Sequence, residues 1–193
     1  MKFLATRRAG FLACFFLLVL ANCGCGGGGE EEDGLVASFE PACPSGDPCY
    51  TGSVTLQPGD ASGAVFEVHV VLNRLETVIV TADLAIGFDP TVVQYQGYTK
   101  GPALGTGDGT NYLVTPGSGE VRAAISVPDG VSLSSASVMI TLAFKALKAG
   151  QTNLNFLDKD VRDGSALCGP PLPELSIIPL GDGGWSGGLA TAD

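Results

Sequence analysis

The stretch VIVTADLAIGFDPTVVQY, residues 78–95, decides the fold of this chain. Up to residue 88 its apolar side chains occupy alternate positions, which is the period of a β-strand with one buried face. The inward row is Val78, Val80, Ala82, Leu84, Ile86 and Phe88, and the outward row is Thr81, Asp83, Ala85 and Gly87. Asp89-Pro90 ends this strand, because proline lacks a backbone donor and fixes φ. A second short strand is expected over residues 92–96.

Similar short extended segments, separated by Gly, Pro, Asn or Asp, occur on both sides of this stretch. Besides the two strands within residues 78–95, the sequence predicts strands over residues 51–57, 65–72, 111–115, 120–127, 137–147, 152–156 and 185–191. No helical periodicity follows the N-terminal segment. Nine short strands with turn residues between them favour an all-β sandwich, and a jelly-roll topology would cover its sheet edges.

The N-terminus has the features of an export signal. It is basic up to Arg8 and continues with an apolar run, residues 9–21, that is too short to span a bilayer. The tetrapeptide Leu20-Ala21-Asn22-Cys23 resembles a bacterial lipobox, which is cut before a cysteine that becomes lipid-modified. We therefore expect a signal peptide over residues 1–22, lipid attachment at Cys23, and export to the bacterial cell envelope as an outer-membrane lipoprotein facing the periplasm or the cell surface. Ordinary cleavage nearby, without a lipid, is the alternative.

Residues 23–49 combine a glycine run, four consecutive acids and a turn-rich cysteine loop. Such a composition predicts a flexible tether, followed by a domain over residues 50–193. Three of the 10 basic residues lie in the signal, so its removal leaves 7 basic against 20 acidic residues and a formal net charge of −13. Because this charge repels nucleic acid, nucleic acid is excluded as a partner.

Four cysteines remain if Cys14 leaves with the signal and Cys23 carries a lipid. Export places them in an oxidising compartment, where an even number of cysteines indicates disulfides. The candidates are Cys25, Cys43, Cys49 and Cys168, whose pairing stays open. The sequence has no CxxC pair and its only histidine is His69, which is interpreted as a surface or boundary residue of a strand. Neither a metal site nor another cofactor is therefore expected.

Residues 158–164, DKDVRDG, offer oxygen ligands at alternating positions, which would suit calcium. Compared with an EF-hand loop, the third ligand and the glycine each come one residue late, and no glutamate closes the loop. We interpret the segment as a solvated turn between strands. With a single histidine there is also no Ser-His-Asp or Cys-His set, so the sequence does not favour an enzyme.

Five segments resemble a cohesin domain, in the order that the family has them. They are residues 63–71, residues 82–93 with LxxxFDPTVV, residues 119–126 with GEVRAAIS, residues 136–145 with SVMITLAFK, and residues 185–188 with WSGG. The resemblance covers about residues 50–191 and implies a non-catalytic module that binds the dockerin modules of partner enzymes. The proline-rich insertion at residues 163–184 and the loop between Cys43 and Cys49 depart from the family.

The resemblance also implies where the partner binds, namely on the outward rows of residues 78–88 and 120–127. The residues concerned are Thr81, Asp83 and Ala85 in the first row and Arg122, Ala124 and Ser126 in the second. An alternative is a carbohydrate-binding module of the same fold, in which sugar rings stack on exposed aromatic side chains. The aromatic candidates are Tyr95, Tyr98, Tyr112 and Trp185. A structural envelope domain with no dedicated ligand is a third possibility.

Overall fold

The computed structural model describes residues 34–45, 52–75, 77–105, 109–163, 176–178, 180 and 184–193. All of them belong to the unit Glu32–Asp193. This described part of the chain contains strands and no helix, so it has no helix that could span a membrane. The predicted signal peptide, Cys23, Cys25, Cys49 and Cys168 lie outside the described residues.

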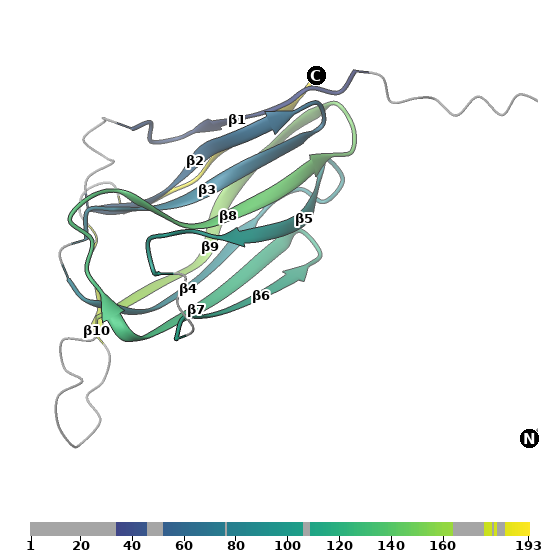
Figure 1. Ribbon diagram of the computed structural model, residues 1–193. Coiled ribbons are helices and arrows are strands. Elements are labelled where there is room, and N and C mark those ends of the chain that lie inside the picture. The colour runs from purple at the N-terminus through teal and green to yellow at the C-terminus, as the bar shows by residue number, and fades with distance from the viewer. Residues whose placement is uncertain are drawn as a thin grey trace, which may run out of the picture. The chain divides into compact units, whose positions relative to one another are not determined.

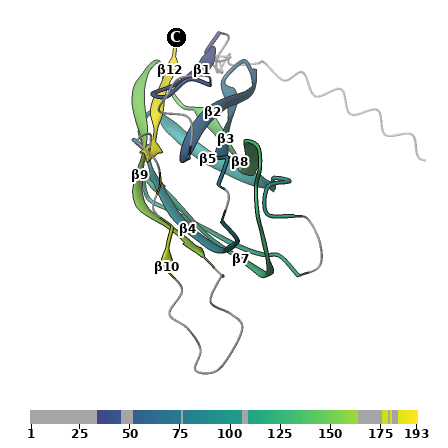
Figure 2. The ribbon, with the colours of Figure 1, turned by 90° about the vertical axis from the view of Figure 1, so that its left-hand side faces the viewer.

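Two sheets pack against each other across a buried core (Figures 1 and 2). The first sheet has the strand order β1-β12-β9-β4-β7-β6, with β10 paired to β9, and the second has the order β11-β2-β3-β8-β5. The strands are β1 Ala37–Pro41, β2 Ser53–Ser62, β3 Val65–Asn73, β4 Ile79–Gly87, β5 Val93–Lys100, β6 Asn111–Gly117, β7 Glu120–Val131, β8 Ser137–Ala146, β9 Gly150–Asp163, β10 Ser176–Ile177, β11 Trp185–Ser186 and β12 Gly188–Ala192. The predicted all-β jelly-roll sandwich is confirmed, with more strands than the nine expected.

The core is built from the inward rows of both sheets. Phe144 of β8 lies at its centre, where its ring stacks on Phe66 with centroids 5.6 Å apart and meets Phe88 edge-on at 5.4 Å. From the first sheet, β4 contributes Leu84 and Ile86, which are both buried as predicted. The apolar residues that alternate along β4 are therefore the ones whose side chains are buried against the second sheet.

The start of β4 differs from the predicted pattern. The strand begins at Ile79, and Ile79 and Val80 are both buried, whereas Val78 is exposed. The register of β4 shifts between Ile79 and Thr81 against both of its neighbours, β7 and β9. A bulge of this kind changes which residues face the core. The prediction that Val78 faces inward is therefore wrong.

Several strands, among them β2, β5, β6, β7 and β9, extend beyond the ends that the sequence pattern predicts. β9 continues to Asp163, so the interpretation of residues 158–163 as a turn is wrong. This part of β9 pairs with β4, with Val161 opposite Ala82 and Asp160 opposite Asp83. β5 extends to Lys100 and β7 to Val131, into segments expected to be loops. The residue at which each of these strands ends therefore depends more on pairing with a neighbouring strand than on the local amino-acid composition.

The two ends of the described chain complete the first sheet. β1 lies before residue 50, where the domain was expected to begin, and pairs with β12. The single strand expected over residues 185–191 is instead two strands in different sheets, because β11 pairs with β2 and β12 pairs with β9. The sandwich therefore includes residues of the predicted tether.

Cys43 follows β1 and is fully buried and disulfide-bonded. Its carbonyl oxygen accepts a hydrogen bond from the Gln57 side chain at 2.7 Å, which holds it against β2. No other cysteine belongs to the described residues, so the partner in this disulfide lies outside them. Which of Cys25, Cys49 and Cys168 pairs with Cys43 stays a prediction.

Candidate partner-binding face

The residues expected to bind a partner lie together on the outer face of the first sheet. β9, β4, β7 and β6 are neighbours there, and their registers align outward residues in three rows across the strands. From β9 to β6 the rows are Asp158, Ala85, Arg122 and Thr115; Asp160, Asp83, Ala124 and Leu113; and Arg162, Thr81, Ser126 and Asn111. We call these twelve residues the partner face. A depression of about 530 Å³ is lined mainly by its first two rows.

The sequence identified the members of this face on β4 and β7 but missed those on β9 and β6. Asp158, Asp160 and Arg162 alternate along β9, with the buried Val161 between the last two. This is the period that identified β4, but acidic outward residues resemble a calcium loop as much as a strand. Leu113 on β6 is 68% exposed, and β6 is too short for its pattern to show which row faces solvent.

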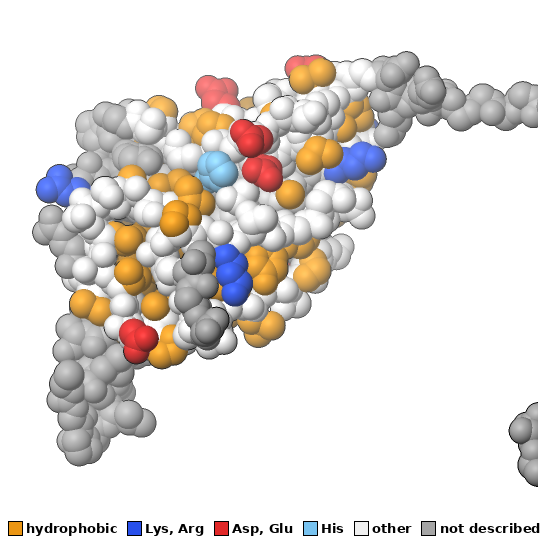
Figure 3. Space-filling view, in the orientation of Figure 1, with side chains coloured by type: hydrophobic (Ala, Val, Ile, Leu, Met, Phe, Trp, Pro, Cys, Tyr) orange, Lys and Arg blue, Asp and Glu red, His pale blue; other side chains and the backbone are white. Residues whose placement is uncertain are grey.

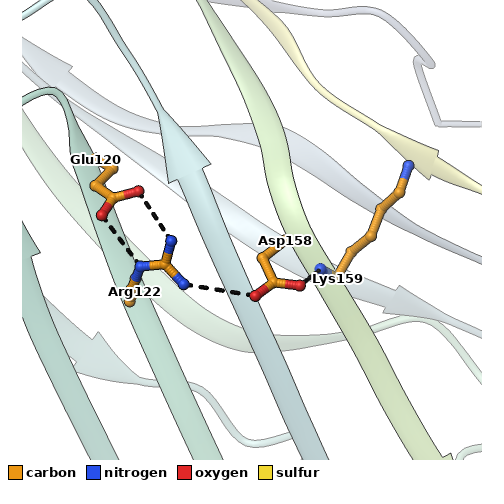
Figure 4. Close-up of polar contacts among 4 residues, drawn as sticks. All are labelled: Glu120, Arg122, Asp158 and Lys159. Carbon is orange, nitrogen blue, oxygen red and sulfur yellow. Dashed lines mark hydrogen bonds and ion pairs between the residues drawn. The ribbon is translucent and has the colours of Figure 1, made fainter.

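Arg122 forms a chain of ion pairs that crosses β4 (Figure 4). Its Nε and Nη2 donate to Glu120 on its own strand at 3.1 and 3.3 Å, and its Nη1 donates to Asp158 on β9 at 3.5 Å. Ala85 of β4 lies between Arg122 and Asp158 in the register and is 0% exposed. Hydrogen bonding to Glu120 raises the pKa of the Arg122 guanidinium. The amine of Lys159 points away from this cluster.

A second arginine pairs within β9. Arg162 donates from Nε to Asp160 Oδ2 at 2.7 Å, and its Nη2 lies 2.6 Å from the same oxygen. The other carboxylate oxygen of Asp160 and the hydroxyl of Thr81 are buried and have no hydrogen-bond partner within the described chain. Both arginines of the partner face are thus occupied by carboxylates that are already on the first sheet.

Asp83 is the carboxylate at the centre of the face, and it has no hydrogen bond or ion pair among the described residues. It is half-buried and lies directly opposite Asp160, where like charges repel. Burial raises the pKa of the Asp83 carboxyl above its usual value, Arg162 lowers it, and Asp160 and Asp158 raise it further. An unpaired charge with these neighbours destabilises the free domain.

The four aromatic candidates for sugar stacking do not form one platform. Trp185 on β11 and Tyr98 on β5 lie at opposite edges of the second sheet. Trp185 and Tyr95 are each half-buried and meet a phenylalanine edge-on, with centroids 4.9 and 6.0 Å apart. Tyr98 stacks on Tyr112 at 6.5 Å, where β5 and β6 lie next to each other. Only these two tyrosines are therefore brought together.

No metal cluster is found in the described part of the chain, where no three His, Cys, Asp or Glu residues are arranged to hold an ion. Asp158 and Asp160, which were compared with a calcium loop, lie on β9 and are paired with Arg122 and Arg162. One oxygen of each carboxylate, Oδ2, is engaged by a guanidinium group on the outer face of the first sheet.

The sequence matches a known protein family over most of the sandwich. The Cohesin domain family matches residues 52–166, a range that contains β2 to β9 and the whole partner face. The chain belongs to the cohesin domain family. Cohesin domains are non-catalytic protein-binding modules, so the expectation that this chain is not an enzyme is confirmed. No curated protein matches the sequence.

Solved cohesins share the fold at low sequence identity. A non-cellulosomal cohesin from the hyperthermophilic archaeon Archaeoglobus fulgidus is 12% identical with a TM-score of 0.52, over 70% of this chain and 88% of that chain. The cohesin module from a family 33 glycoside hydrolase of Clostridium perfringens is 13% identical with a TM-score of 0.50, over 74% and 95%. A type II cohesin from the cellulosome of Acetivibrio cellulolyticus is 14% identical with a TM-score of 0.50, over 66% and 95%.

Proposed function

We propose that this cohesin domain binds a dockerin-type protein partner through the partner face. Asp83 is the observation that carries the proposal, because it is a half-buried carboxylate that has no partner within the described chain. A donor from a bound protein would satisfy this carboxylate and remove the repulsion from Asp160. Dockerin is the partner that the cohesin resemblance implies.

Two exposed leucines add apolar contact area to the same face. Leu113 lies on β6 beside Ala124, and Leu157, 61% exposed, lies against Gly87 of β4. Leu157 is the extra residue at a register shift, since Asp158 pairs with Ala85 and Phe156 pairs with Ile86. Burying a leucine side chain contributes about 1.5–3 kcal/mol. The face thus offers apolar anchors on both sides of the central carboxylate.

For Arg122 we propose a supporting role, whereas the resemblance implies direct contact with the partner. Its guanidinium is occupied by Glu120 and Asp158, so it acts on the partner by holding these two carboxylates in place. Asp83 and the leucines are then the exposed or half-buried groups of the face that can contact the partner directly. Replacing Arg122 should therefore weaken binding less than replacing Asp83 does.

Capture of purified dockerin modules from the same organism tests this proposal. Ala124 is exposed on the partner face, and Ala143 is half-buried on the outer face of the second sheet. Ala124→Arg should weaken capture at least about 100-fold, the size expected for a clash at an interface centre, while the matched Ala143→Arg should not. Both variants should melt like the wild type. Failure of every dockerin to bind, or equal loss in both variants, would reject the proposal.

We extend the proposal to the cell envelope, where the lipobox resemblance at Cys23 would tether the module to a membrane. This part depends on the sequence alone. Labelling with a radioactive fatty acid should mark the wild-type chain and not Cys23→Ala. Equal labelling of the two would mean that the lipid is attached to another residue, and no labelling of either would reject the lipid anchor.

A further inference from the structure

Two depressions on the outer face of the first sheet share the middle row of the partner face. One has a volume of about 530 Å³ and lies toward the first row, and the other has a volume of about 280 Å³ and lies toward the third row. Asp83, Ala124 and Leu113 line both depressions. These three residues follow one another across β4, β7 and β6. A side chain of a bound protein that lay along this row would therefore reach Asp83.

The part of the row on β7 and β6 is apolar. Ala124 is exposed and presents a methyl group, and Leu113 is 68% exposed. An aliphatic chain laid over these two side chains would remove both from water, which is favourable in proportion to the apolar area covered. This part of the row favours a partner side chain with an apolar stem.

The part of the row on β9 is acidic. Asp160 lies directly opposite Asp83, and Asp158 lies in the neighbouring row. Each of these two aspartates on β9 has an ion pair, Asp160 with Arg162 and Asp158 with Arg122. Among the described residues Asp83 has no ion pair. The sheet therefore uses both arginines itself and leaves Asp83 as a charge beside two other carboxylates.

A neutral donor would satisfy the Asp83 carboxylate only in part. A hydroxyl donates one hydrogen bond, but the negative charge would stay next to Asp160 in an interface from which water has been removed. A cation compensates the charge and donates hydrogen bonds at the same time. Lysine and arginine also bury their methylene stems on apolar surface while the charged head stays among polar groups. They are the side chains that match both parts of the row.

We propose that the bound protein lays one lysine or arginine side chain along this row, with its stem on Leu113 and Ala124 and its cationic head at Asp83. The inference rests on the proposed function, because it names the group that a dockerin-type partner supplies to the partner face. The chain has 20 acidic against 10 basic residues, which also attracts a partner with a basic binding surface. The affinity should accordingly fall as the salt concentration rises.

Capture of a purified dockerin by the exported form of the chain, measured at several salt concentrations, tests the inference. Asp83→Asn keeps a hydrogen-bond acceptor and removes the charge, so it should weaken capture at least about tenfold and reduce its salt dependence. Asp60→Asn, at an exposed carboxylate on β2 of the second sheet, is the matched control and should leave capture unchanged. Figure 3 looks onto the outer face of that sheet, where acidic side chains lie near the single histidine of the chain. Capture by Asp83→Asn with wild-type affinity would mean that the partner supplies a neutral donor, and would overturn the inference.

Charge reversal identifies the side chain of the partner. Asp83→Lys should weaken capture at least about 100-fold, because it places a second cation against the first. Each lysine and arginine of the captured dockerin is then replaced by glutamate in turn. One of these dockerin variants should bind Asp83→Lys and lose its binding to the wild type. Restoration by none of them would contradict a cation at Asp83.

The variant Ala124→Arg separates failure of this inference from failure of the proposed function. If no dockerin binds, or if Ala124→Arg captures as the wild type does, the partner face is wrong and the inference falls with it. If Ala124→Arg loses capture while Asp83→Asn does not, the face binds its partner without a cation at Asp83, and only the inference fails. Thermal melts of the variants verify that a lost response does not come from unfolding.

Discussion

The two outer faces of the sandwich are built on the same strand geometry and differ in their side chains. The first sheet presents a charged surface with exposed leucines, in which two arginines are paired with carboxylates and Asp83 is not. The second sheet presents a shallow groove that is lined mostly by uncharged side chains of β3, β8 and β5. The fold fixes rows of side chains across strands, and the identity of those side chains decides what each face can bind. We therefore expect the two faces to respond independently to substitutions on either one.

The largest effect should come from the core that supports both faces. Phe144→Ala removes the buried ring that contacts Phe66, Phe88 and Tyr95 and leaves a cavity between the sheets. The free energy of unfolding should fall by about 3–5 kcal/mol, and urea titration measures it. Capture of a dockerin by the partner face should decline as the folded fraction falls. Unchanged stability of the variant would show that the Phe144 ring does not support the two faces.

A pair of glycine substitutions compares the two faces directly. At Gly59, on the second sheet, a new Cβ meets the Cβ of Glu67 and the ring of His69, which cannot move without shifting β3. At Gly87, on the first sheet, it meets only the end of the Leu157 side chain. Gly59→Ala should therefore cost about 1–3 kcal/mol in urea unfolding, and Gly87→Ala should cost less because Leu157 can rotate away. An equal loss of unfolding free energy in the two variants would show that the two faces are equally rigid.

The charge of Asp83 should make the stability of the domain depend on pH. Its folded pKa is raised above the ordinary value of 3.8, so the native state holds this proton more tightly than the unfolded state does. The contribution of Asp83 to stability should fall as pH rises from below 3.8 through the folded pKa. Asp83→Asn should remove this dependence and melt slightly higher at neutral pH, as measured by calorimetry at several pH values. A lower melting temperature for the variant at pH 7 would mean that Asp83 has a stabilising partner in the domain.

The smallest effect on stability should come from the ion pairs of Arg122. Its side chain and that of Asp158 are 54% and 64% exposed, and exposed ion pairs contribute little and are screened by salt. Arg122→Met should lower the melting temperature slightly at low ionic strength and leave it unchanged at high salt. Lys148→Met, at an exposed position outside the partner face, is the matched control. If the melting temperature of the variant stays lower at high salt, Arg122 stabilises the domain by packing on Ala85 and not only by its ion pairs.

The sequence predicts the sandwich because burial alternates along β3, β4, β7 and β8, and a local pattern carries that information. It does not predict β1 or the division of residues 185–191 between two sheets, since both depend on pairing with distant strands. The same limit applies to the end of β9, where pairing with β4 decides the structure of an acidic segment.

In the candidate sites, too, the parts that depend on local sequence could be predicted, and the parts that depend on distant strands could not. The β4 and β7 rows of the partner face were predicted from the cohesin resemblance together with local alternation. The contact between Arg122 and Asp158 needs the register of three strands, and the groove needs β3, β8 and β5 side by side. Tyr98 and Tyr112 were predicted as separate candidates, and only the approach of β5 to β6 makes them a stacked pair.

Hydrogen exchange on a captured dockerin complex tests the central claim most directly, because it reports every strand of both sheets at once. Binding through the partner face predicts slower amide exchange in β9, β4, β7 and β6 and no change in β3, β8 and β5. Slower exchange confined to the second sheet, or spread equally over both, would contradict the assignment of the partner face.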